Sequence, residues 1–196
     1  MKSLIAAVAI AWTPQVGDIV FSTNTTRPGR LPLYRIARAG PPTHVAIVYQ
    51  RPNGSYGLLE STEHTGVVVS SFWELTRPDR THVYVRRIRR PLTRMESRTF
   101  QIWAERQIGK PFAGYVRAGM TALGPCTLQP FRAQLESRKW ACSELAAAAT
   151  VALGRVDATG VAPKLTDPQD LISDEFLNLS KHWEKPVPWD TRGLHP

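Results

Sequence analysis

Cys142, His44 and Glu60 are three residues whose types could together perform acyl chemistry. A nucleophilic cysteine needs a base that takes its thiol proton, and the base needs a third group that orients its ring. His44 is the candidate base and Glu60 the candidate orienting group. Each residue alone has a plainer interpretation, as a packed core cysteine, a strand-end histidine or a solvated glutamate. The residue types by themselves therefore leave both interpretations open at each of the three positions.

The position of Cys142 favours this chemistry. Residues 140–153 are rich in alanine and Gly154 follows them, a pattern typical of a helix with a glycine at its C-terminal end. Cys142 lies in the first turn, where the helix dipole and unpaired backbone N–H groups favour a thiolate over a thiol. The same N–H groups could stabilise an oxyanion, a contribution of about 3 to 4 kcal/mol per donor.

Short β-branched runs bounded by turn residues predict the strands that position His44 and Glu60. His44 begins an apolar run, and the turn at residues 51–54 predicts a hairpin with Glu60 at the end of its second strand. The expected strands are residues 19–21, 44–49, 56–60, 67–69 and 81–85. Residues 23–42 hold four prolines and several arginines, which indicates a long surface loop that could form one wall of a cleft.

Three helices are expected. The first spans residues 93–108, with its apolar residues largely on one face and Gly109 ending it. The second is the alanine-rich helix at 140–153, and the third begins at Asp167-Pro168 and runs to about residue 179. Residues 110–139 are mixed, although residues 114–120 could open a short helix. The apolar face expected on the first helix consists of Met95, Phe100, Ile102, Trp103 and Ile108.

In the order of these motifs the chain resembles the permuted papain-like amidases of the YiiX and YebB type, relatives of the NlpC-type peptidases and of lecithin:retinol acyltransferase. In that family a Gly-Asp strand, a His strand, a strand closed by Glu, a Gly-Lys-Pro turn and a Cys-Ser-Glu helix follow one another. The corresponding segments are Gly17-Asp18-Ile19-Val20-Phe21, Thr43-His44-Val45-Ala46-Ile47-Val48, Leu58-Leu59-Glu60-Ser61, Ile108-Gly109-Lys110-Pro111-Phe112 and Trp140-Ala141-Cys142-Ser143-Glu144-Leu145. The resemblance covers roughly residues 14 to 175.

The resemblance implies an α+β fold of the circularly permuted papain-like (NlpC-like) type, with a small antiparallel sheet packed against helices in a single domain over residues 1–196. It implies a cysteine amidase or peptidase that uses Cys142, His44 and Glu60 on peptide, peptidoglycan-fragment or acyl-lipid substrates. Two features depart from the family. Ser61-Thr62-Glu63 follows Glu60, so Glu63 could compete for the orienting role, and Phe112-Ala113 replaces the usual Tyr-Asp.

Other classes of function stay open. A binding module could keep the fold without turnover, and a lipid acyltransferase could use the basic loop at 23–42 to meet anionic headgroups. The net charge of +9, with a cluster at Arg86, Arg87, Arg89 and Arg90, permits peripheral contact with anionic surfaces. No basic motif interleaved with aromatic residues supports nucleic-acid binding, which ranks last. The oligomeric state and the substrate stay undetermined.

No cofactor or metal is expected. Cys126 and Cys142 lack the spacing and partner histidines of a zinc site, although a bridge between them stays open. His64 and His82 are placed outside the site. Residues 1–11 resemble a signal peptide but are shorter than usual, so a cytoplasmic protein is favoured slightly over an exported one. No apolar stretch reaches the length of a membrane span.

Overall fold

The computed structural model describes residues 12–24, 41–76, 80–114, 135–161, 163, 166–174 and 177–189. The expectations for the segment 1–11, for most of the loop at 23–42 and for a helix at 114–120 fall on residues outside this part of the chain, as does Cys126. Thr23 and Asn24, which the sequence assigned to that loop, instead continue the first strand.

One six-stranded sheet carries the fold, and every strand pair in it is antiparallel. The order across the sheet is β4-β3-β2-β1-β5-β6. The five strands expected from the sequence are confirmed, with β3 continuing two residues past Glu60, whereas β6 was not expected. The strands are β1 (Ile19–Asn24), β2 (His44–Gln50), β3 (Tyr56–Thr62), β4 (Gly66–Ser70), β5 (Arg80–Arg86) and β6 (Val187–Pro188).

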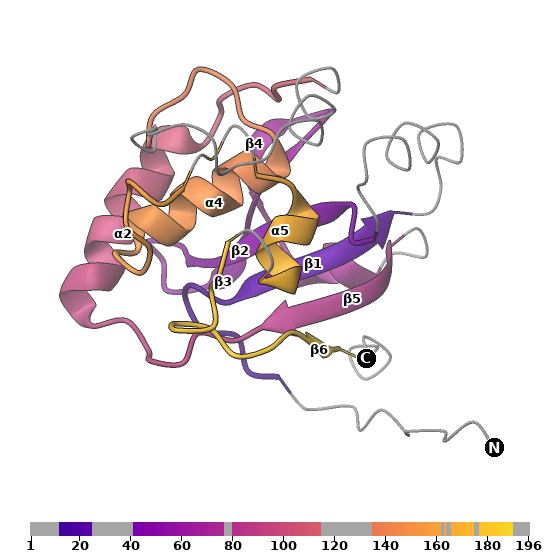
Figure 1. Ribbon diagram of the computed structural model, residues 1–196. Coiled ribbons are helices and arrows are strands. Elements are labelled where there is room, and N and C mark those ends of the chain that lie inside the picture. The colour runs from indigo at the N-terminus through magenta and orange to yellow at the C-terminus, as the bar shows by residue number, and fades with distance from the viewer. Residues whose placement is uncertain are drawn as a thin grey trace.

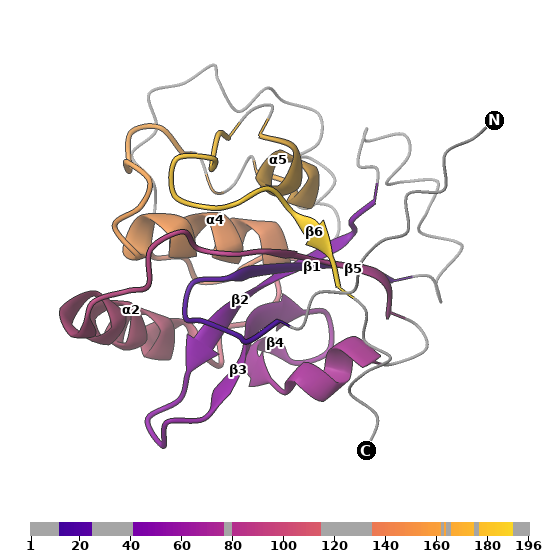
Figure 2. The ribbon, with the colours of Figure 1, turned by 90° about the horizontal axis from the view of Figure 1, so that it is seen from below.

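Strand alternation gives the sheet two buried faces, which belong to separate hydrophobic clusters. Val45 and Ile47 of β2 face the larger cluster, which includes residues of the helices α2 (Arg94–Gln107) and α4 (Cys142–Ala152). Ala46 and Val48 face a smaller cluster that contains Leu75 of the short 3₁₀ helix η1 (Phe72–Thr76). Figure 2 shows α4 and α5 (Pro168–Ser173) on one side of the sheet and η1, in magenta, on the other. The fold is therefore α+β.

The helix α2 begins where the sequence predicts, but it buries a different face. The Thr93 side chain accepts a hydrogen bond from Glu96 N–H, and the Glu96 carboxylate accepts one from Thr93 N–H, which forms a capping box. The buried residues are Phe100, Trp103, Ala104 and Gln107, which follow the i, i+3, i+4, i+7 spacing of one helix face. Of the five residues expected on that face, Met95, Ile102 and Ile108 are exposed.

The alanines of α4 explain its position in the molecule. They are buried against the strands β2 and β3 and against α2, because small side chains let the helix approach the sheet closely. In Figure 1 the helix crosses in front of the sheet, with α2 beside it. The helix starts at Cys142, two residues later than predicted, and ends before Gly154, whose φ of +68° suits glycine.

The last helix is shorter than the sequence predicts. We expected it to run from Asp167-Pro168 to about residue 179, but α5 spans Pro168–Ser173. Asp174 takes a left-handed conformation with φ 61°, and its carboxylate accepts from both Arg86 Nη2 and Leu179 N–H. The residue that follows the last turn of α5 is therefore bonded by Arg86, a buried arginine on β5 that lies more than eighty residues earlier in the chain.

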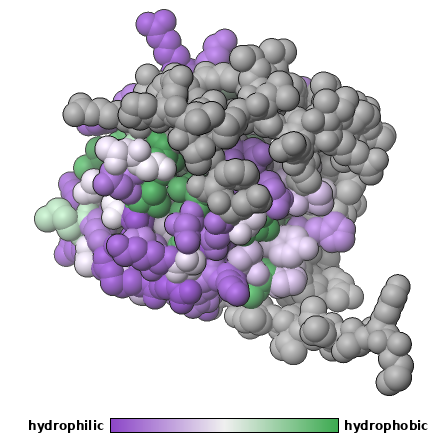
Figure 3. Space-filling model, viewed as in Figure 1, coloured by the Kyte–Doolittle hydropathy of each residue, from purple (hydrophilic) through white to green (hydrophobic). Residues whose placement is uncertain are grey.

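The described surface is mostly hydrophilic in the view of Figure 3. On α2, charged side chains such as Arg94, Arg98 and Glu105 point to solvent. Within the part of the chain that the structure describes, no helix is both long and apolar enough to cross a membrane.

Candidate functional site

The structure brings His44 and Glu60 together across neighbouring strands. Ile47 pairs with Leu59, and continuing this antiparallel register places Ala46 opposite Glu60 and His44 diagonally from it. The Nε2 atom of His44 lies 2.5 Å from Oε2 of Glu60. The Glu60 side chain is 2% exposed and that of His44 is 17% exposed, so solvent screens this pair little.

Cys142 completes the group at the first residue of α4. Its thiol is free, and the His44 side chain and the backbone N–H groups of Val45 and Ser143 lie close enough to lower its pKa. Since Nε2 of His44 is bonded to Glu60, Nδ1 is the ring nitrogen left for the thiol. The imidazole therefore lies between a thiol and a carboxylate.

The electrostatics of the group favour a charged pair. Burial lowers the pKa of His44, but hydrogen bonds and charge interactions with Cys142 and Glu60 outweigh it and raise this pKa to about 9. Burial raises the pKa of the Cys142 thiol, but the His44 ring and the two backbone N–H groups outweigh it, and the pKa falls below its usual value. Thiolate and imidazolium therefore stabilise each other.

The backbone before Cys142 is fixed by several bonds. The Ser61 hydroxyl donates to the Trp140 carbonyl at 2.7 Å, and both residues are buried. Trp140 also exchanges backbone hydrogen bonds with the turn ahead of it: Trp140 N–H donates to Pro111 O and Ala113 N–H donates to Trp140 O. These bonds hold the start of α4, and with it the sulfur, against the sheet.

The Gly109-Lys110-Pro111 turn joins this segment to β4. Gly109 N–H donates to Val67 O, and Val67 N–H donates to Lys110 O. Gly66 has a φ of +68°, and a Cβ atom on it would lie 2.3 Å from Lys110 O, so only glycine fits there. The turn thus ties β4 to the residues that precede Cys142.

Ser70 is a site residue that sequence analysis missed. Its hydroxyl donates to Oε1 of Glu60, on the opposite oxygen from the one that His44 contacts. A local signal existed, because alternation along β4 places Ser70 on the same face as Val68, which pairs with Glu60. The register between β3 and β4 was still needed to show that Ser70 reaches this carboxylate.

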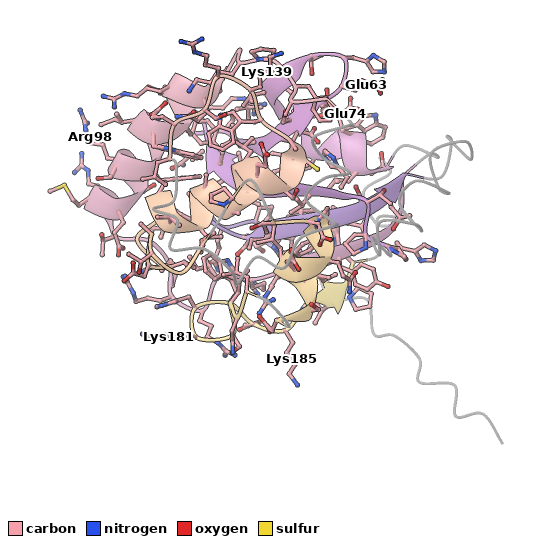
Figure 4. The ribbon with its side chains drawn as sticks, turned by 45° about the horizontal axis from the view of Figure 1, so that its top comes forward. Glu63, Glu74, Arg98, Lys139, Lys181 and Lys185 are labelled. Atoms are coloured by element: carbon pink, nitrogen blue, oxygen red, sulfur yellow. The ribbon has the colours of Figure 1, made fainter. Side chains whose placement is uncertain are left out.

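The other candidate side chains do not contact His44 in this way. Glu63 lies in the turn between β3 and β4, and Figure 4 shows it at the periphery of the molecule. His64 is exposed in the same turn, and His82 is exposed on β5. Of the two carboxylates between which the sequence left the choice open, Glu60 is therefore the one that contacts His44.

Three arginines of the cluster at 86–90 make contacts within the protein, although only Arg86 is buried. Arg86 is fully buried and donates to both carboxylate oxygens of Asp174 and to Leu171 O. Arg89 Nε donates to Ser180 O, and Arg90 pairs with Glu96 at 2.5 Å. The cluster seen in the sequence is thus mainly a set of structural contacts.

Across the described ranges, no group of three or more His, Cys, Asp or Glu residues could hold a metal ion.

Comparisons with known proteins support the fold. No protein-family model matches the chain, and neither does any curated protein. Among solved structures, the chain is similar to the crystal structure of a protein described as the metalloprotein YiiX, DUF1105, from Escherichia coli O157:H7. The TM-score is 0.51 and the sequence identity 19%, over 91% of this chain and 90% of that chain. The six-stranded antiparallel sheet and its helices therefore form a YiiX-like fold.

Proposed function

We propose that the chain is a cysteine amidase or peptidase-type hydrolase, with Cys142 as nucleophile, His44 as base and Glu60 as the group that orients His44. The observation that carries this proposal is the position of the His44 ring, which bonds Glu60 at 2.5 Å and lies close enough to the Cys142 thiol to lower its pKa. A histidine held between a thiol and a buried carboxylate has the contacts that nucleophilic catalysis requires.

In the proposed reaction the Cys142 thiolate attacks the carbonyl carbon of an amide or ester, and the carbonyl oxygen becomes an oxyanion. Cys142 N–H lies in the first turn of α4, where backbone donors have no partner within the helix, and it would contribute to stabilising this charge. The His44 imidazolium then donates its proton to the leaving amine or alkoxide as the carbon–heteroatom bond breaks. A thioester between Cys142 and the acyl group results.

Deacylation reverses these roles. Neutral His44 takes a proton from water as the oxygen attacks the thioester, and the acyl group leaves as a carboxylic acid with release of the thiolate. Glu60 keeps the same ring orientation in both half-reactions. If an amine or hydroxyl acceptor replaced water, the same intermediate would complete an acyl transfer.

The order of the elements is consistent with a circularly permuted papain-like fold of the NlpC type. In papain-type order the cysteine helix precedes the histidine strand, whereas here β2 and β3 come before α4. The spatial group of thiol, imidazole and carboxylate is independent of chain order. The resemblance to the amidase family leads us to propose peptides, peptidoglycan fragments or acyl lipids as substrates.

The test is the pH dependence of Cys142 alkylation by iodoacetamide, resolved by peptide mass spectrometry, in the wild type, His44→Ala and His64→Ala. It needs no substrate. We expect Cys142 to react at slightly acidic pH in the wild type and in His64→Ala, because its pKa is lowered, and to lose this reactivity in His44→Ala. His64 is an exposed turn histidine, so its variant controls for the general effect of removing an imidazole.

An unperturbed thiol at Cys142 would contradict the proposal. If Cys142 titrates like an ordinary thiol near its unperturbed pKa of about 8.5, or is inert, the hydrolase proposal fails and a binding module of the same fold takes its place. A wild-type result in favour would justify a screen of acyl substrates, in which water as the sole acceptor separates hydrolysis from acyl transfer.

A further inference from the structure

Ser70 lies at the end of a diagonal line of polar side chains across three strands. Leu58 pairs with Ser70 and Glu60 with Val68, so Ser70 is the diagonal neighbour of Glu60 on β4. His44 is its diagonal neighbour on β2, displaced in the opposite direction along the strands. Side chains of this length can meet across such a diagonal. The sheet register therefore places Glu60 between His44 and Ser70.

His44 and Ser70 contact different carboxylate oxygens of Glu60. Oε2 lies 2.5 Å from His44 Nε2, and Oε1 accepts a hydrogen bond from the Ser70 hydroxyl. A carboxylate held by one oxygen can still rotate about its last side-chain torsion, which is a soft degree of freedom. A second bond on the other oxygen removes that freedom and stabilises the anion, because a hydrogen bond to a charged group is stronger than one to a neutral group.

The hydroxyl of Ser70 has one proton and two acceptors in reach. Leu58 O is 3.4 Å away, a long contact, whereas the contact to Glu60 is shorter and charge-assisted. The geometry therefore favours donation to the carboxylate.

The backbone of Ser70 is itself anchored. Arg51 Nη2 donates to Val69 O at 2.9 Å and to Ser70 O at 3.3 Å, and Arg51 Nη1 donates to Tyr56 O at 2.9 Å. The arginine fits because residue 57 is glycine: a Cβ there would lie 2.7 Å from Ser70 O and 2.9 Å from Arg51 Cζ. The hydroxyl is thus presented from a fixed part of the sheet.

We propose that Ser70 is a positioning residue of this site: its hydroxyl holds the Glu60 carboxylate in the orientation in which Glu60 orients His44 and supports its positive charge. This role rests on the proposed function, since it acts through His44 on the Cys142 thiolate. Ser70 touches no reacting atom.

The experiment compares the pH profile of Cys142 alkylation in the wild type, Ser70→Ala, Ser70→Thr and Ser71→Ala. Ser71 is the exposed next residue, so its variant makes the same chemical change outside the site. We expect Ser70→Ala to raise the pKa of Cys142 and to slow alkylation at slightly acidic pH roughly tenfold, the effect of one hydrogen bond to a charged group. Ser70→Thr, which keeps the hydroxyl, should restore most of the rate, and Ser71→Ala should match the wild type.

Circular dichroism and thermal unfolding establish which variants keep the native fold. If Ser70→Ala does not fold, Ser70→Cys replaces it, because a thiol is similar in size but a much weaker donor. An unchanged profile in the folded alanine or cysteine variant, with an activated Cys142 in the wild type, would overturn the role of Ser70 and leave the proposed function standing. An ordinary thiol pKa in the wild type would overturn both.

Discussion

His44 Nε2 lies 2.5 Å from Glu60 Oε2, and this contact joins diagonal neighbours on β2 and β3. The acceptor is almost wholly buried, so the carboxylate interacts with the ring in an environment of lower dielectric than water. An imidazolium at this position is stabilised, whereas a neutral ring would leave a buried anion less compensated. Together with the interaction of the ring with Cys142, this contact outweighs the effect of burial and raises the pKa of His44.

Replacing Glu60 by Gln should weaken the proposed thiolate–imidazolium pair. The substitution conserves size but removes a charge next to His44, so the pKa of the ring should fall and that of Cys142 should rise. We expect Cys142 alkylation at slightly acidic pH to fall by about tenfold or more. Glu63→Gln is the matched control and should react like the wild type. Full reactivity in Glu60→Gln together with its loss in Glu63→Gln would transfer the orienting role to Glu63.

The two half-buried histidines of the described residues, His44 and His182, should have pKa values shifted in opposite directions. The pKa of His44 is raised to about 9, whereas burial and the positive charges of Lys181, Arg155 and Arg90 lower the pKa of His182 below its usual value. His44 should therefore stay protonated as pH rises past neutrality and lose its proton near 9. NMR titration of the ring resonances checks the direction of both pKa shifts. Turnover that needs the imidazolium as an acid should decline over the same alkaline range, and a His44 that titrates below 6.5 would contradict the charged pair.

Alanine substitutions at Gly66 and Gly54 should differ in cost. Both residues have positive φ, +68° and +86°, so alanine pays a left-handed backbone penalty of about 1 to 2 kcal/mol at either position. At Gly66 the new Cβ would also lie 2.3 Å from Lys110 O, whereas nothing lies within 4 Å of it at Gly54. Urea unfolding should therefore show a larger loss of unfolding free energy for Gly66→Ala. Equal losses would mean that the turn at 109–111 moves away from β4 at little cost.

Asp174→Asn should destabilise the fold through Arg86. Arg86 is fully buried and Asp174 is 23% exposed, so removing the negative charge leaves a buried guanidinium uncompensated. We expect a loss of about 3 kcal/mol in unfolding free energy. Asparagine also tolerates the left-handed conformation at this position, so the backbone cost stays small. The exposed Asp157→Asn is the control and should leave stability close to that of the wild type. A similarly small change for Asp174→Asn would show that this pair does not stabilise the fold.

Local sequence patterns predicted much of the fold, but they failed where contacts between residues far apart in the sequence determine the structure. The capping box at Thr93 and the turn residues before His44 act within a few positions, so the starts of α2 and β2 could be predicted from them. The face of α2 that is buried could not be predicted from local patterns. Gln107 is fully buried, and its side chain bonds Trp140 and Glu136, which come from another part of the chain.

By itself, the sequence determined that a cysteine begins an alanine-rich helix and that a histidine begins an apolar strand, because helix and strand periodicities are local properties. Only the tertiary structure decided which carboxylate meets His44 and that Ser70 holds it. The choice between Glu60 and Glu63, and the contact with Ser70, depend on the register of β2, β3 and β4, and a shift of one residue would turn these side chains to the other face of the sheet.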